Sequence, residues 1–131
     1  MYDLHDFLEP VLINTINGDN GYNDGQFAKN INIYQTELPD ITDADIVIVG
    51  VTETRGCGAF DNAEAAPDVI RKELYQLHFW HKDVSIADIG NIKTGETLND
   101  SYAAIKTVLA ELLRQNKTVV ILGGSHDITL A

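Results

Sequence analysis

The sequence predicts an α/β fold built on a parallel sheet. Three short apolar runs rich in β-branched residues, at 46–51, 84–89 and 118–122, are each closed by turn-forming residues. Two longer segments with helical spacing, at 66–80 and 97–116, separate these runs. Strands and helices that alternate in this way form a βαβαβ unit with right-handed crossovers, so the sheet that they build is parallel.

Residues 1–43 are expected to form an irregular N-terminal arm, and residues 44–131 the βαβαβ portion. The segment Asn14–Asn32 is rich in asparagine, glycine and aspartate, which favour turns because they tolerate left-handed backbone angles. Within the arm, Asp3–Leu8 is predicted to form one short helical turn and Ile31–Tyr34 a brief strand.

The first strand and the first helix have clear signals. Ile46–Val51 is a continuous β-branched run, which is typical of a parallel strand buried on both faces. Pro67 suits the first turn of a helix, and Asp68 beside it favours the positive end of the helix dipole. These signals predict a helix over Ala66–Trp80. The residues expected on its buried stripe are Ile70, Leu74, Leu77 and His81.

The second half of the unit repeats the pattern. Val84–Ile89 is predicted as the second strand, and Thr97 with Asp100 resembles a capping box that opens the second helix. Asn116 is a reasonable end for that helix, and Thr118–Leu122 is predicted as a third buried strand. The residues expected on the apolar stripe of the second helix are Tyr102, Ile105, Leu109 and Leu112.

The predicted strand order is 2-1-3, which creates a switch point between the first and third strands. Ligands of open α/β sheets bind at the carboxyl ends of the strands around such a point. Thr52–Gly58 and Gly123–Asp127 are therefore expected on opposite walls of one pocket.

The charge distribution argues against polyanionic partners. The chain of 131 residues has a formal net charge of −11. Residues 1–68 hold 13 acidic and two basic residues, and residues 69–131 hold seven of each. Because no basic stripe compensates for the acidic half, we expect no binding to nucleic acid or to anionic membranes.

Cysteine content and the first residues predict a cytoplasmic protein. The single cysteine, Cys57, excludes an intrachain disulfide and a thiolate zinc cluster. The first ten residues carry three acids and no base, unlike a signal or transit peptide, and no apolar run reaches about 18 residues.

The sharpest candidate for chemistry follows the third strand. Gly123 and Gly124 let the chain turn abruptly, so His126 is presented at the carboxyl edge of the sheet with Asp127 beside it. Histidine is a common metal ligand, and a neighbouring carboxylate can hold its tautomer. The same residues also fit a glycine turn in which Ser125 or Asp127 caps the next helix.

Three other features are weaker candidates. Gly56 and Gly58 follow a strand, but the next helix starts too late for its N-terminus to face a pyrophosphate. His78 and His81 are spaced so that they could share a metal, although histidines near a helix end more often contact free carbonyls. Cys57 has no identifiable base, which favours an inert residue.

Four stretches carry a resemblance to a known family: Asp45–Val51, Ala66–Arg71, Ala87–Asn91 and Val120–Asp127. In this order they resemble the N-terminal part of the ureohydrolases, the family of arginase, agmatinase and formimidoylglutamase, over about residues 44–131. The glycine-containing loop and the Ala-Pro helix start look most like formimidoylglutamase.

The resemblance implies a three-layer α/β/α fold around a mainly parallel sheet, of which this chain holds the first βαβαβ portion. It also implies two manganese ions that activate a bridging hydroxide, with His126 as one ligand. The family usually has Gly-Gly-Asp-His-Ser or Gly-Gly-Gly-His-Glu at this point, whereas Ser125 and Asp127 flank the histidine here. The remaining ligands of the family lie in later aspartate-rich motifs, so the chain is expected to be an N-terminal fragment that holds no metal pair by itself.

These observations predict part of a metal-dependent C–N hydrolase that acts on a linear amidine or guanidino compound, inactive as this fragment. The substrate would be a small molecule, and the apolar edge of the third strand predicts self-association. Two alternatives are a non-catalytic member of the family, used for binding or assembly, and a small α/β nucleotide-binding module.

Overall fold

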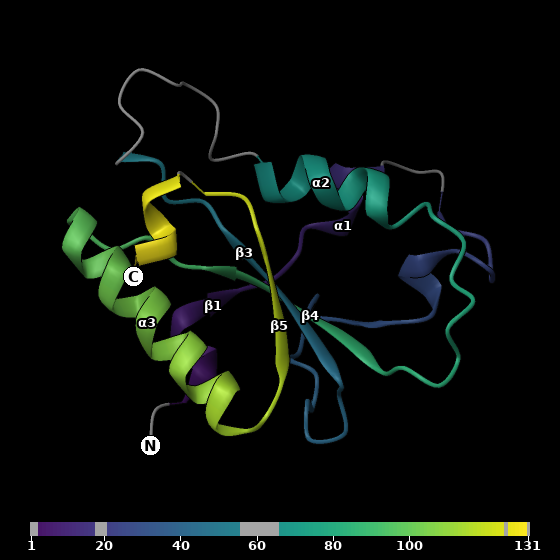
Figure 1. Ribbon diagram of the computed structural model, residues 1–131. Helices are drawn as coiled ribbons and strands as arrows, with labels where there is room; N and C mark the ends of the chain where they lie inside the picture. Colours follow the sequence, from purple (N-terminus) through teal and green to yellow (C-terminus); the bar gives the residue numbers. More distant parts are fainter. Residues whose placement is uncertain (1–2, 18–20, 56–65, 125, 131) are drawn as a thin grey trace.

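The computed structural model describes residues 3–17, 21–55, 66–124 and 126–130. Figure 1 shows the elements, which lie around one central sheet. The strands are β1 (Leu8–Glu9), β2 (Asn32–Ile33), β3 (Ile46–Val51), β4 (Ile86–Ile92) and β5 (Thr118–Leu122). The helices are α1 (Ile13–Asn17), α2 (Ala66–Leu74) and α3 (Leu98–Arg114), and the 3-10 turns are η1 (Leu4–Phe7), η2 (Phe27–Lys29) and η5 (His126–Leu130).

The three expected strands lie in the predicted order, because β3 pairs in parallel with β4 on one side and with β5 on the other. The N-terminal arm adds the predicted brief strand, β2, parallel to β4. It also adds β1, which is antiparallel to β4, so the whole sheet is mixed, while the three strands of the βαβαβ unit are parallel as predicted. Both short strands cover the outer edge of β4, whose backbone groups would otherwise lack partners.

The second strand begins and ends later than predicted, at Ile86–Ile92 instead of Val84–Ile89. Gly90 is one of the turn-forming residues expected to close the predicted strand. It lies inside β4 instead, at a register shift between β3 and β4. Its φ of +81° suits glycine, and a Cβ there would lie 2.0 Å from the carbonyl oxygen of Glu9. A glycine in a strand can therefore mark a bulge instead of an end.

Helices cover both faces of the sheet, which gives the predicted three layers. Successive residues of β3 point to opposite faces. Val47 and Val49 pack in the cluster that contains Ile105 of α3, whereas Ile48 packs in the cluster that Leu74 of α2 covers. The capping box of α3 is confirmed, because the Asp100 amide donates to Thr97 Oγ1 at 3.1 Å and the Thr97 amide to Asp100 Oδ2 at 3.2 Å.

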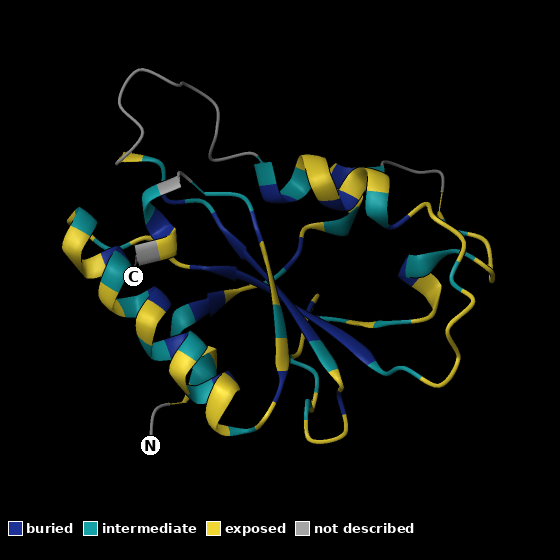
Figure 2. Cartoon of the chain, in the orientation of Figure 1, coloured by how far each residue is buried: buried dark blue, intermediate teal, exposed yellow. Residues whose placement is uncertain are grey.

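The third strand is present as predicted but is not buried. Figure 2 shows β3 and β4 almost entirely buried, while β5 is partly exposed along its length. Val120 and Ile121 are 41% and 40% exposed. The reason is position, because β5 pairs only with β3 and forms an edge of the described sheet.

Helix α2 ends at Leu74, six residues before the predicted Trp80. Its backbone continues into contacts with the arm, where the Phe27 amide donates to the carbonyl of Leu77 at 2.7 Å and the Phe79 amide to Gly25 at 2.9 Å. The predicted apolar stripe is also wrong, since Ile70 and Leu77 are exposed. The buried residues on the inward face of α2 are Pro67 and Arg71, and Leu74 is partly buried beside them.

That face holds a buried ion pair between Arg71 and Asp88, both with fully buried side chains. The guanidinium donates from Nε and Nη2 to the two carboxylate oxygens, each at 2.9 Å. It also donates to the side chain of Asn91 at 2.6 Å and to the carbonyl of Gly90 at 3.0 Å. The Tyr75 hydroxyl donates to the same carboxylate at 2.6 Å. Every polar atom of the pair therefore has a partner, as burial requires.

Replacing Arg71 with methionine should destabilise the protein by about 3–5 kcal/mol, because Asp88 would be buried without its countercharge. The measurement is urea unfolding at neutral pH. Tyr75→Phe removes one hydrogen bond to the same carboxylate and should cost about 1–3 kcal/mol. The matched control is Arg114→Met, which breaks an exposed pair with Glu111 and should cost no more than about 1 kcal/mol. Equal effects of Arg71→Met and Arg114→Met would contradict this account.

Candidate functional site

The carboxyl ends of β3, β4 and β5 meet at one edge of the sheet. Parallel pairing of the three strands requires this arrangement. The loops that leave this edge carry the polar residues around which a site can form. They are described in turn below.

After β3, Glu53 and Arg55 form a close ion pair. The Glu53 side chain is only 2% exposed, and it accepts from Arg55 Nε at 2.9 Å and from Arg55 Nη2 at 2.5 Å. The backbone amide of Arg55 donates to the second carboxylate oxygen at 2.7 Å. Hydrogen bonding from the Arg55 side chain, helped by Ser101, lowers the pKa of Glu53 to about 2. The carboxylate therefore stays charged at neutral pH despite its burial.

Arg55 also ties this loop to the loop that follows β4. Its guanidinium donates to the carbonyl oxygens of Glu96 at 2.7 Å, Gly95 at 2.8 Å and Thr97 at 3.2 Å. Ser101 accepts both from this guanidinium, at 3.1 Å, and from the Gly95 amide, at 2.8 Å. A cavity of about 590 Å³ lies over the pair. It is lined by Thr52, Glu53, Thr54, Arg55, Thr94 and Gly95.

After β5, Gly123 and Gly124 make the predicted abrupt turn. Their φ angles are +78° and +80°, a region that favours glycine. A Cβ on Gly123 would lie 2.7 Å from the ring of Pro67, and one on Gly124 would lie 3.0 Å from the side chain of Val51. The turn is thus packed between the end of β3 and the start of α2.

His126 and Asp127 begin the short turn η5. The side chain of His126 and the whole of Ser125 lie outside the described residues. The carboxylate of Asp127 accepts a hydrogen bond from the hydroxyl of Tyr102 on α3. This hydrogen bond raises the pKa of Tyr102, so the hydroxyl remains a donor. Asp127 is therefore oriented by α3, whereas the role of His126 as a metal ligand stays a prediction.

The expected two-walled pocket is present only in part. Thr52 to Arg55 and the segment from Gly123 onward reach the same edge of the sheet, but the cavity over Glu53 is completed by the loop after β4. Gly56, Cys57 and Gly58, including the candidate nucleotide loop, lie outside the described residues. Among the residues that are described, no three histidine, cysteine, aspartate or glutamate side chains gather closely enough to hold a metal ion.

The two other histidines considered as metal ligands, His78 and His81, lie away from this edge. His78 and His81 precede β4, so they lie toward the amino end of that strand, and both are exposed. The ring of His81 stacks on Trp80 with centroids 3.6 Å apart. His78 pairs through its backbone with Gln26. Their positions favour surface packing over a shared metal.

The sequence interpretation did not find the pairing of Glu53 with Arg55 or that of Tyr102 with Asp127. The first pair had one signal, a glutamate two residues after a buried strand with an arginine two residues further on. The second joins residues 25 apart in the chain, and only the packing of α3 brings them together.

The residues of the turn after β5 and of the start of α2 both lie in a stretch that matches a known protein family. The sequence model described as the Arginase family matches residues 44–131. The chain belongs to the arginase family. The match begins just before β3 and leaves out the N-terminal arm, residues 1–43.

Relatives of this arginase-family chain agree in name. A formimidoylglutamase of Hahella chejuensis is 35% identical over 66 residues, which make up 50% of this chain and 20% of that protein. The structure of Trypanosoma cruzi formiminoglutamase with Mn²⁺ is similar with a TM-score of 0.63 and 25% identity, over 69% of this chain and 34% of that one. An arginase superfamily protein of T. cruzi is similar with a TM-score of 0.61 and 24% identity, over 72% of this chain and 38% of that one.

This member of the arginase family thus spans about a fifth of the curated relative and about a third of the solved structures. The fold is arginase-like, with the first portion of that fold present. In the described part of the chain, no helix combines the length and the apolar character needed to cross a bilayer.

The Glu53 pair should make stability depend on pH in acid. A carboxylate whose pKa is lowered in the folded state stabilises the protein above its unfolded pKa, near 4.5, and that contribution is lost as the pH falls toward 2. The contribution should be about 1–2 kcal/mol, because Arg55 is 43% exposed and solvent screens the pair.

Urea unfolding of wild type and Glu53→Gln between pH 6 and pH 2 checks this prediction. The difference in stability between the two proteins should shrink across this interval. The exposed Glu73→Gln on α2 is the matched control and should follow wild type at every pH. A constant difference between wild type and Glu53→Gln would show that the ion pair is not the cause.

Proposed function

We propose that this chain is the N-terminal part of a metal-dependent C–N hydrolase that acts on a linear formimidoyl or guanidino compound, as a formimidoylglutamase does. The observation that carries the proposal is the Gly-Gly-Ser-His-Asp segment, which begins at the carboxyl end of β5. The names of the relatives support it, since a formimidoylglutamase and a Mn²⁺-containing formiminoglutamase are among them.

In this proposal His126 supplies one ligand of a manganese pair, and further ligands come from the rest of an intact protein. Bound manganese would lower the pKa of a water molecule and so supply the hydroxide that attacks the substrate. Within this chain, Tyr102 holds the Asp127 carboxylate beside His126, and Arg55 fixes the neighbouring loops.

The setting of the intact enzyme follows from the same reasoning. We place it in the cytoplasm with a small-molecule substrate, and its charge of −11 argues against nucleic acid. Two alternatives keep separate tests. A non-catalytic member of the family would have the fold without activity, and a nucleotide-binding module would be protected by nucleotides against thermal unfolding.

Manganese titration of the isolated 131-residue chain should show no tight stoichiometric binding, and the chain should hydrolyse neither formimidoylglutamate nor arginine. The reason is that one ligand cannot hold two ions. Isothermal titration calorimetry and release of formamide or urea are the measurements. Tight binding of one or two equivalents would contradict the single-ligand assignment.

The product of the whole gene is expected to bind manganese and to release formamide from formimidoylglutamate. His126→Ala in that protein should lower both metal content and activity by at least roughly tenfold. His81→Ala removes an exposed histidine and should leave both unchanged. A folded gene product with neither metal nor activity would favour the non-catalytic alternative.

We further propose that the isolated chain self-associates through the edge of β5. Val120 and Ile121 are exposed there, and an apolar edge strand offers unpaired backbone groups to a second chain. Light scattering should show a mass that rises with concentration. Val120→Lys should reduce this rise, whereas Val69→Lys, at a position that is 62% exposed on α2, should not. A clean monomer at high concentration would disprove the proposal.

A further inference from the structure

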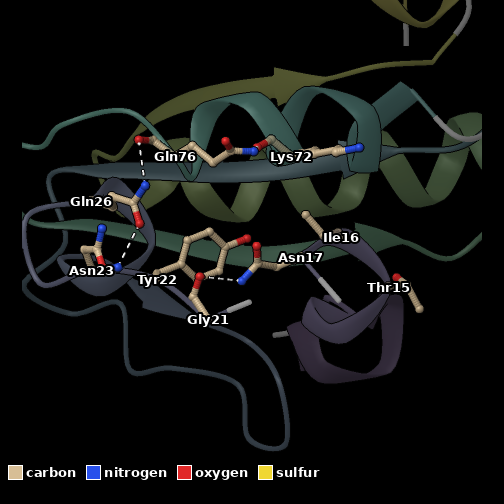
Figure 3. A pocket seen from close by; sticks show the side chains of 9 residues that line it. All are labelled: Thr15, Ile16, Asn17, Gly21, Tyr22, Asn23, Gln26, Lys72 and Gln76. Carbon is tan, nitrogen blue, oxygen red and sulfur yellow. Dashed lines mark hydrogen bonds between the residues drawn. The ribbon is translucent and has the colours of Figure 1, made fainter. Parts of the chain in front are cut away.

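A polar pocket of about 550 Å³ lies between the N-terminal arm and α2, apart from the site described above. Figure 3 shows Lys72 of α2 and Gln76, which follows that helix, at one side of the pocket, with Tyr22, Asn23 and Asn17 at the other. Its described lining consists of Thr15, Ile16, Asn17, Gly21, Tyr22, Asn23, Gln26, Lys72 and Gln76. The volume lies within the range of small-molecule sites.

One wall of this pocket comes from residues that the family match leaves out. The arm residues between Thr15 and Gln26 precede the matched stretch, which begins at residue 44. Lys72 and Gln76, by contrast, lie within it. The pocket therefore joins the N-terminal arm, which lies outside the family match, to α2 and the residue that follows it, and the proposed hydrolase function does not account for it.

Internal hydrogen bonds fix the walls of the pocket. The Asn17 side chain donates to the carbonyl of Gly21 at 2.7 Å, and the backbone N–H of Asn23 donates to Gln26 Oε1 at 2.8 Å. Gln26 in turn donates to the carbonyl of Gln76 at 3.2 Å, which links the arm to the residues that follow α2. A pocket with walls fixed in this way needs little rearrangement to accept a ligand.

Several polar groups in the lining have no partner among the described residues. They are the ammonium of Lys72, the hydroxyl of Tyr22 and the side-chain amide of Asn23. Burial raises the pKa of Tyr22, so its hydroxyl is a donor at neutral pH. Three donors thus belong to residues that line one pocket, and Lys72 is the one charged residue in the described lining.

We propose that this pocket binds a small hydrophilic carboxylate that also carries hydroxyl groups, with its carboxylate at Lys72 and its hydroxyls at Tyr22 and Asn23. The ammonium and the neutral donors match a carboxylate oxygen and hydroxyl oxygens. The side-chain oxygens of Asn17 and Asn23 accept from the ligand's hydroxyls.

Binding at this pocket is coupled to the core. The ring of Tyr22 packs edge-on against Tyr75, with centroids 6.1 Å apart, and Tyr75 donates to Asp88 of the buried ion pair. A ligand that holds Tyr22 in place stabilises the docked arm and, through Tyr75, the ion pair. Ligand binding should therefore raise the melting temperature of the protein.

The test is calorimetry and thermal unfolding of the 131-residue chain with D-gluconate and, as an uncharged match of the same length, D-sorbitol. We expect gluconate to bind and to raise the melting temperature, and sorbitol to bind at least roughly tenfold more weakly. No binding of gluconate, or equal binding of the two compounds, would overturn the proposal.

Two variants locate the site. Lys72→Gln should weaken gluconate binding by roughly tenfold, whereas Lys106→Gln makes the same change of charge at an exposed position of α3 and should have no effect. Equal affinities of the Lys72→Gln protein and wild type would place the anion elsewhere and disprove the assignment.

Discussion

The buried ion pair between Arg71 and Asp88 constrains much of the structure around it. Two charges removed from water are tolerated only when their remaining donors and acceptors are satisfied. The pair therefore requires the carbonyl of Gly90, the side chain of Asn91 and the hydroxyl of Tyr75 in fixed positions. Gly90 and Asn91 belong to β4, and Tyr75 belongs to the turn that follows α2. One pair thus fixes the distance and rotation of the helix over the sheet.

Two departures from regular geometry follow from this requirement. The bulge in β4 places the Gly90 carbonyl toward the guanidinium, while the Gly90 amide donates to Asp88 at 3.1 Å. The end of α2 places the Tyr75 hydroxyl over the same carboxylate and frees the following backbone to bind the arm. The strand is irregular at the first point and the helix ends at the second, and both departures supply hydrogen bonds to the buried ion pair. Val69 and Ile70 of α2 remain exposed, because Arg71 takes a central place on the inward face between Pro67 and Leu74.

The parts of the fold that could be predicted are those in which one local pattern decides the structure. β3 is continuously apolar, and α3 has both a capping box and a regular stripe, so both were predicted close to their observed bounds. The end of α2 could not be predicted from the sequence. Arginine is usually a surface residue, and only the folded structure shows that Arg71 and Tyr75 are buried against Asp88. In the site, the glycine turn before His126 was visible in the sequence. The hydrogen bond from Arg55 to the carbonyl of Gly95, 40 residues away, depends on tertiary packing and could not be seen in the sequence.

The stretches that resemble the family contain two sets of residues, one that stabilises the fold and one that is placed for chemistry. Arg71, Asp88 and Asn91 hold α2 on the sheet, and their polar groups bond to one another. The presence of these residues is therefore evidence for the fold and not for a reaction. His126 and Asp127 follow the carboxyl end of β5, and the described side chain of Asp127 bonds Tyr102 instead of the buried ion pair. A protein could keep the first set and lose the second without unfolding. Similarity carried by the first set is therefore evidence for ancestry, whereas evidence for hydrolysis must come from the histidine and from the ligands that join it.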